Sequence, residues 1–267
     1  MKLHVWLLLA LAVLLAACRA NDSKSPSANL TSANHAKGAA MSQKILILVT
    51  SHDRLGETGE KTGFWLEELA APYRVFVEAG AHVDIASPKG GKPPADPRST
   101  EKPSEDVRWF LANPEATRKL DASLAIDSIQ GDYDAYFVVG GHGVMWDLAT
   151  HPGSNKLLGA AFDRGKVVAA VCHGPGALIN VRTANGDPLV KGRRVAGFSN
   201  EEERAVKLDT VVPFALESRL RDLGGLYERG PNWSSFAIRD GRLVTGQNPQ
   251  SSAQAARETL AALSAAR

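Results

Sequence analysis

The chain is short of cysteine and carries no excess of either charge. Only Cys18 and Cys172 occur among 267 residues, and the formal net charge is +2. A balance this close to neutral gives no electrostatic reason to expect a nucleic-acid partner. The motifs HExxH, CxxC and GxxxxGK[ST] are also absent. The sequence therefore predicts no metal and no other cofactor.

The longest apolar run lies at the N-terminus. Lys2 precedes an apolar stretch and small residues, and Cys18 follows directly. The run is too short for an ordinary membrane-spanning helix and is typical of a bacterial lipoprotein signal. We therefore expect a signal peptide over 1–17, a lipid on Cys18, and a disordered Ser/Asn/Ala-rich tether over 18–42. The expected partner is a membrane, reached through that lipid anchor.

These features predict a lipoprotein that faces the periplasm at the cell envelope. Arg19 favours the outer membrane by analogy with such lipoproteins. Two alternatives stay open, namely a plain secretory signal with an incidental cysteine, and a cytosolic protein whose translation starts at Met41. If Cys18 carries lipid, Cys172 has no disulfide partner and needs another reason to be present.

Short apolar runs alternate with helical patterns from residue 43 to the C-terminus. Strands are predicted at 44–50, 82–87, 134–141, 166–172 and 193–199, with a hairpin at 236–246 that turns at Asp240-Gly241. Helical patterns cover 62–79, interrupted by Pro72, the stretch before the fourth strand, and 251–266. This alternation predicts an α/β domain over 43–267, with a doubly wound, mostly parallel sheet flanked by helices.

Residues 88–132 separate two predicted strands by more than a crossover needs. The segment begins rich in proline and glycine and then becomes helical. We predict an insert at about 88–132, which either covers the ligand cleft or decorates the surface.

The stretch AAVCHGPGAL, residues 169–178, ends a predicted strand on Cys172. Chemistry collects at the carboxyl ends of parallel strands. The small residues around Cys172 suit a sharp turn on which a nucleophile is held in a strained conformation. A helix from Gly174 to Leu178 would favour the thiolate, and His173 can act as its base. The alternative is a buried structural cysteine beside an incidental histidine.

An acidic partner for the thiol is predicted in the first helical pattern. Glu68 shares the apolar face with Phe64, Pro72 and Phe76, whereas Glu67 lies on the polar side. Burial would raise the pKa of Glu68 and let its carboxyl group donate a hydrogen bond to a thiolate. A core glutamate satisfied by backbone groups is the alternative.

Two further strand ends carry polar residues. VVGGHG, residues 138–143, ends in glycines whose amides can bind an oxyanion, and His142 is either a second base or a loop histidine. SNEEERAV, residues 199–206, offers Glu201, Glu202 and Glu203, one of which could orient His173 in a triad. Spacing does not decide which, and a charged first helical turn is the alternative.

Several ordered motifs, namely AAVCHGP, GGHGVMWD, KTGFWLEE, GFSNEEE and DGRLVTGQNP, place these residues in a known context. With them the chain resembles the ThiJ/PfpI superfamily of class I glutamine-amidotransferase-like proteins. It is most similar to the branch of glutathione-independent glyoxalases, also described as chaperones and deglycases. The resemblance implies a flavodoxin-like sandwich with Cys172 as nucleophile, His173 as base, Glu203 as triad acid and Glu68 against the thiol.

The resemblance also implies an oxyanion hole made by the amides of Gly141 and Cys172. We further expect His142, Gly140 and Trp146 to line the substrate pocket. The family's true amidotransferases use a distant His-Pro-Glu, which this sequence lacks. That difference argues against glutamine hydrolysis.

The activity that the resemblance implies is conversion of a small 2-oxoaldehyde, such as methylglyoxal, into a 2-hydroxy acid without glutathione. Protein deglycation is a related activity of the same site. The alternatives are a holdase chaperone or redox sensor, and a PfpI-type cysteine peptidase. Family habit suggests a homodimer.

Overall fold

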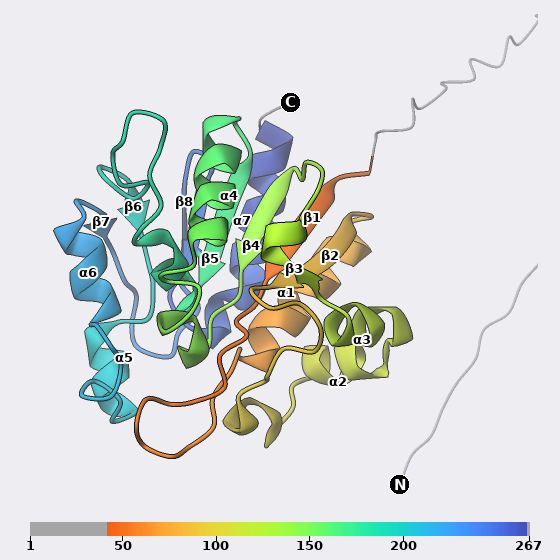
Figure 1. The fold of residues 1–267 in the computed structure, drawn as a ribbon, viewed down its shortest axis with the longest axis horizontal. Coiled ribbons are helices and arrows are strands. Elements are labelled where there is room, and N and C mark those ends of the chain that lie inside the picture. The colour runs from red at the N-terminus through yellow and green to blue at the C-terminus, as the bar shows by residue number, and fades with distance from the viewer. Residues whose placement is uncertain (1–41, 266–267) are drawn as a thin grey trace, which may run out of the picture. The chain divides into compact units, whose positions relative to one another are not determined.

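Seven strands form one sheet in the order β3-β2-β1-β4-β5-β9-β8 (Figure 1). The computed structural model describes residues 42–265. Neighbouring strands are parallel except for β8, which runs antiparallel to β9. The strands are β1 (Lys44–Leu48), β2 (His82–Ser87), β3 (Leu124–Ala125), β4 (Ala135–Val138), β5 (Val167–Val171), β8 (Ala237–Asp240) and β9 (Leu243–Gly246).

Helices cover both faces of this sheet. In Figure 1, α4 lies in front of the central strands, while α1 and α7 lie together behind them. Every residue of β4 and β5 is buried, as expected for strands covered on both faces. The helices are α1 (Leu66–Glu78), α2 (Glu105–Ala112), α3 (Pro114–Asp121), α4 (Pro152–Asp163), α5 (Asn200–Ala205), α6 (Leu216–Asp222) and α7 (Ser252–Ala265).

The central strands identify the fold. The order β2-β1-β4-β5-β9 is the flavodoxin-like arrangement. In it, the direction in which successive strands are added to the sheet reverses between β1 and β4. Ligands in such sheets bind beyond the carboxyl ends of the strands at that reversal. The predicted fold class is confirmed.

Helix α1 differs from its prediction at two points. It begins at Leu66 rather than Thr62, because Phe64 is extended and its N–H donates to the Pro94 carbonyl at 3.0 Å. It also runs without interruption through Pro72. The ring of Pro72 is buried with the apolar face of the helix, and this packing outweighs the missing backbone hydrogen bond.

Two predicted strand features shift in the structure. The run 193–199 keeps only β6 (Arg194–Val195), which pairs with β7 (Leu226–Tyr227) in a separate two-stranded sheet. The Ala196 N–H donates to the Thr245 hydroxyl instead of continuing the ladder. The hairpin turns at Gly241 and Arg242, one residue later than predicted, and Gly241 has a φ of 60°.

The segment predicted as an insert contributes to both the sheet and the site. It contains α2, α3 and the edge strand β3, and a short 3-10 helix, η1 (Pro97–Thr100), that carries Arg98. Ser104 and Asn113 cap α2 and α3 through their side-chain oxygens. Between residues 42 and 265, no helix combines the length and apolar character needed to cross a bilayer.

Candidate active site

A cavity of about 170 Å³ opens beyond the carboxyl ends of the central strands. Cys172 follows β5 directly, and His142 follows β4 on a short 3-10 helix, η3 (His142–Met145). The sheet therefore brings together segments that are 30 residues apart in the chain (172 minus 142). The cavity is lined by Trp65, Glu68, Arg98, Gly141, His142, Cys172, His173, Phe198, Val206, Trp233 and Pro249.

Cys172 sits on a strained turn. Its φ is 59°, a left-handed conformation that costs energy for any residue with a side chain, and its side chain is buried. The predicted elbow is therefore present. The segment after it is a 3-10 helix of five residues, η4 (Gly174–Leu178), rather than an α-helix. The helix dipole expected to favour the thiolate is correspondingly small.

A chain of polar contacts leads away from the thiol. Cys172 Sγ lies 3.3 Å from His173 Nδ1, and His173 Nε2 lies 2.8 Å from Glu203 Oε2. All three side chains are buried. This is the order of groups that activates a thiol nucleophile through an oriented base.

The structure selects among the three consecutive glutamates. Glu203 alone among them reaches His173, because the first turn of α5 directs its side chain toward the two imidazole rings. Glu202 closes a capping box with Ser199. Glu201 points outward and pairs with Arg229 at 2.6 Å.

Glu68 is fully buried against the thiol. Its Oε2 accepts the Gly140 N–H at 2.8 Å, and burial raises the pKa of this carboxyl group well above its ordinary value. Burial therefore favours the protonated form of Glu68, which can donate a hydrogen bond to sulfur. Burial also raises the pKa of the Cys172 thiol, and a charged Glu68 would raise it further. The resting residue is thus a thiol whose proton His173 must take.

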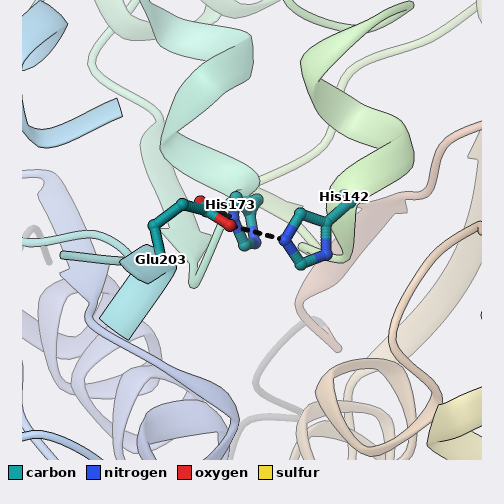
Figure 2. Close-up of side chains that lie close together, drawn as sticks. All are labelled: His142, His173 and Glu203. Carbon is teal, nitrogen blue, oxygen red and sulfur yellow. Dashed lines mark hydrogen bonds and ion pairs between the residues drawn. The ribbon is translucent and has the colours of Figure 1, made fainter. Parts of the chain in front are cut away.

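His142 joins the same carboxylate from the other side. Its Nε2 lies 2.8 Å from Glu203 Oε1, and the two imidazole rings are 4.0 Å apart (Figure 2). Burial alone would raise the pKa of Glu203, but His173 and His142 reverse this and hold it far below its ordinary value. Glu203 is therefore ionised and accepts one hydrogen bond on each oxygen.

The same three groups are the place to look for a metal ion. One ligand atom each from His142, His173 and Glu203 lie within 4.8 Å of one another, the candidate cluster among residues 42–265. Two imidazoles and a carboxylate form a ligand set that zinc accepts. Here each Nε2 instead faces a carboxylate oxygen at hydrogen-bond distance. That the protein needs no metal stays a prediction.

The oxyanion hole differs from the one expected. The Cys172 N–H donates to the Gly246 carbonyl at 3.0 Å, so it is held in the sheet and is not available. The amides that approach the sulfur belong to Gly141 and His173. Gly141 has a φ of 92°, a conformation that only glycine adopts readily.

Two residues expected in the pocket lie outside it. The Gly140 amide is used by Glu68, and Trp146 stacks on His52 at 5.3 Å rather than facing the cavity. Of the three predicted pocket residues, only His142 lines the cavity. Both errors arise from reading proximity in sequence as proximity in space.

Most of the apolar wall was not predicted. Trp65, Phe198, Val206 and Pro249 lie within the motifs quoted above, but nothing in those motifs marked them as cavity residues, and Trp233 lies outside all of the motifs. Trp233 can be recognised as unusual only in the structure, where its φ is 60° and the residue is 42% exposed although it is a large aromatic. Arg98 lies in the proline-rich segment, where no pattern marked it as a site residue, and it forms an ion pair with Asp96 at 2.6 Å.

Acid is expected to destabilise the fold through His142. Burial and the neighbouring His173 lower the pKa of His142 to about 4. Between the ordinary histidine value of about 6.5 and this value, the unfolded chain binds a proton that the folded chain does not, so stability falls as pH falls. The loss is on the order of 3 kcal/mol. The lowered pKa of Glu203 adds a loss of the same sign at lower pH.

Urea unfolding of the wild type and His142→Gln at about pH 7 and about pH 4.5 measures this effect. The variant should lose much less stability across the interval. An equal loss in both proteins would show that His142 is not the group responsible.

Known proteins resemble this chain over most of its length. Glyoxalase 3 of Candida albicans is 31% identical, with 82% of this chain and 98% of that protein covered. A glutathione-independent glyoxalase of Saccharomyces cerevisiae is 29% identical, covering 83% and 98%. The crystal structure of Rapid Encystment Protein 24 kDa from Francisella tularensis is 36% identical, with a TM-score of 0.80, covering 83% and 99%.

These comparisons overturn the predicted location at a bacterial cell envelope. Curated relatives that resemble the chain over most of its length are glyoxalases of yeasts, cells that have no outer membrane carrying bacterial lipoproteins. The membrane partner, which depended on that location, is withdrawn with it. The signal over 1–17, the lipidated Cys18 and the tether up to residue 41 lie outside the described residues. The domain boundaries and the homodimer stay predictions.

The family resemblance inferred from the motifs is tested by a family model. The model of the DJ-1/PfpI family matches residues 61–262, a range that contains the elbow, both histidines, Glu68 and Glu203. This match covers well over half of the chain and agrees with the strand order and with the relatives above. The chain belongs to the DJ-1/PfpI family.

Proposed function

We propose that this protein converts small 2-oxoaldehydes such as methylglyoxal into 2-hydroxy acids without glutathione. The observation that carries the proposal is the contact chain from Cys172 through His173 to Glu203 beside a small cavity. The names of the yeast relatives support the same chemistry.

The reaction begins with the thiol. His173 Nδ1, 3.3 Å from the sulfur, takes the Cys172 proton as the sulfur bonds to the aldehyde carbon. Glu203 stabilises the imidazolium that forms, because its carboxylate accepts the Nε2–H at 2.8 Å. The carbonyl oxygen becomes an alkoxide near the amides of Gly141 and His173, and the proton that His173 took from the thiol passes to this oxygen to give a hemithioacetal.

An internal oxidation and reduction follows. The aldehyde carbon loses its hydrogen as a proton, and the adjacent ketone carbon gains one through an enediolate. The first carbon thereby becomes the carbonyl of a thioester on Cys172, and the second becomes an alcohol carbon. Water then hydrolyses the thioester, releasing the 2-hydroxy acid and restoring the thiol, so no external oxidant is needed.

The cavity favours a small substrate. A volume of about 170 Å³ is below the usual range of about 300–1,000 Å³ for drug-sized ligands. Its exposed lining is largely apolar, and its polar side chains include Glu68, His142 and His173. A three-carbon aldehyde fits such a space, whereas a polypeptide main chain requires an open groove.

The direct test follows methylglyoxal loss and lactate formation by the purified full chain, with and without added glutathione. We expect turnover at the same rate in both conditions. Turnover that requires glutathione, or none from folded protein, would contradict the proposal.

Glu68 offers a test of its protonation state. In Glu68→Gln the side-chain oxygen can still accept the Gly140 N–H, and the amide group can face the sulfur as a protonated carboxyl would. We expect turnover within about tenfold of the wild type, against a loss of about 10²-fold or more in Glu68→Ala. If Glu68→Gln is as impaired as Glu68→Ala, the site needs an ionised carboxylate.

A further inference from the structure

His142 has one ring nitrogen that nothing in the fold uses. Its Nε2 contacts Glu203, but its Nδ1 is buried without a hydrogen-bond partner among residues 42–265. The side chain is only 6% exposed and forms part of the wall of the cavity that contains Cys172. A buried polar atom with no partner is costly, so its presence beside a reactive sulfur calls for an explanation.

The contact with Glu203 determines which nitrogen carries the proton. An ionised carboxylate only accepts hydrogen bonds, so Nε2 must hold the hydrogen at 2.8 Å from Oε1. In the neutral ring Nδ1 then carries a lone pair and can only accept. His142 therefore has a free proton acceptor on a ring that forms part of the cavity wall, and the carboxylate behind it would stabilise the ring if it became charged.

The proposed reaction requires two proton movements. The hemithioacetal has a hydrogen and a hydroxyl on its first carbon and a carbonyl on its second. Its conversion to the thioester moves one proton from carbon to carbon and another from oxygen to oxygen. His173 Nδ1 has passed the thiol proton to the first oxygen by this stage, so it is neutral again and, as the base nearest the sulfur, can move the carbon-bound proton. A second base is needed at the oxygens.

We propose that His142 carries the proton between the two substrate oxygens, an inference that rests on the proposed function. Nδ1 takes the hydroxyl proton from the first oxygen as the carbon–oxygen double bond of the thioester forms. The same nitrogen then gives that proton to the second oxygen, which becomes the hydroxyl of the product. The first carbon is oxidised and the second reduced by the same electron pair, so the atoms and electrons balance within the adduct.

The arrangement of the two rings suits this division of work. Their centroids are 4.0 Å apart, and Glu203 contacts both through different oxygens (Figure 2). Each imidazole can therefore become positively charged in turn against the same carboxylate. His173 Nδ1 contacts the sulfur, whereas His142 Nδ1 has no partner among the described residues and is free for a substrate oxygen.

His142→Gln is the informative variant. The glutamine amide can still donate to Glu203, but its oxygen is too weakly basic to carry a proton. We expect turnover of methylglyoxal to fall by about 10²–10⁴-fold. Alkylation of Cys172 by iodoacetamide should keep its wild-type rate, since the Cys172–His173–Glu203 contacts remain. Hydroxylamine should trap lactohydroxamate from the wild-type thioester but none from the variant, which stops at the hemithioacetal.

The controls separate this role from a structural one. His142→Asn serves as a second variant should the glutamine protein fail to fold, and His82→Gln replaces an exposed histidine outside the cavity. Turnover in His142→Gln within about threefold of wild type would overturn the inference. So would a parallel loss of alkylation, which would mean that His142 only supports the triad. Absence of turnover in the wild type would instead overturn the proposed function and this inference with it.

Discussion

Replacing Cys172 by serine is expected to abolish the conversion of methylglyoxal, lowering turnover by roughly 10⁴-fold or more. A serine hydroxyl is a far weaker acid and a weaker nucleophile than a thiol, so a site arranged around sulfur activates it much less well. The cavity, the amides of Gly141 and His173, and the two histidines would all remain. The loss would therefore report the covalent step alone.

The fold should tolerate this change. Serine has nearly the shape of cysteine and meets the same positive φ of 59° that the elbow imposes. Thermal unfolding should give a midpoint close to that of the wild type, while iodoacetamide should no longer label residue 172. Equal turnover in Cys172→Ser and the wild type would rule out a thiol-dependent mechanism.

The second large effect is expected from Glu203→Gln. The carboxylate accepts an N–H from His142 and another from His173, one on each oxygen. Glutamine has a single side-chain oxygen, which can accept the N–H of only one of the two rings. Its NH₂ group then faces the N–H of the other ring, so two hydrogen-bond donors oppose each other. One imidazole must change tautomer or lose its hydrogen bond, and neither would be stabilised when charged. We expect turnover to fall by about 10³–10⁴-fold.

Stability should fall in the same variant, because one buried imidazole N–H loses its acceptor, at a cost of about 1–3 kcal/mol. Steady-state kinetics and urea unfolding measure the two effects separately. Glu201→Gln is the matched control, since Glu201 is two residues away and 52% exposed, paired with Arg229. Its turnover and stability should stay near the wild type. A Glu203→Gln protein with normal turnover would remove the triad from the mechanism.

The residues of the site lower the stability of the fold. Glu68, His142 and Glu203 are buried polar groups, and Cys172 holds a strained backbone conformation. Each would be unfavourable in isolation. They are tolerated because the sheet and its covering helices bury a large apolar core around them.

Some features of this protein follow from the sequence alone. The buried strands and the order of elements were predictable because apolar runs of strand length alternate with helical patterns, and that period depends only on local residues. The elbow at Cys172 was predictable for the same reason, since the strand end and its small neighbours are contiguous. Glu68 was distinguishable from Glu67 because helical periodicity assigns the two to opposite faces.

Other features were decided only by the tertiary structure. Which of three consecutive glutamates reaches His173 depends on where α5 lies, and one residue of register would turn a different carboxylate inward. The Cys172 amide could not be recognised as engaged until β5 was paired with β9. The second imidazole at Glu203, the cation of Arg98 and the ring of Trp233 reach the cavity from loops far apart in the chain. Such contacts arise from packing between distant segments, which no local pattern of residues records.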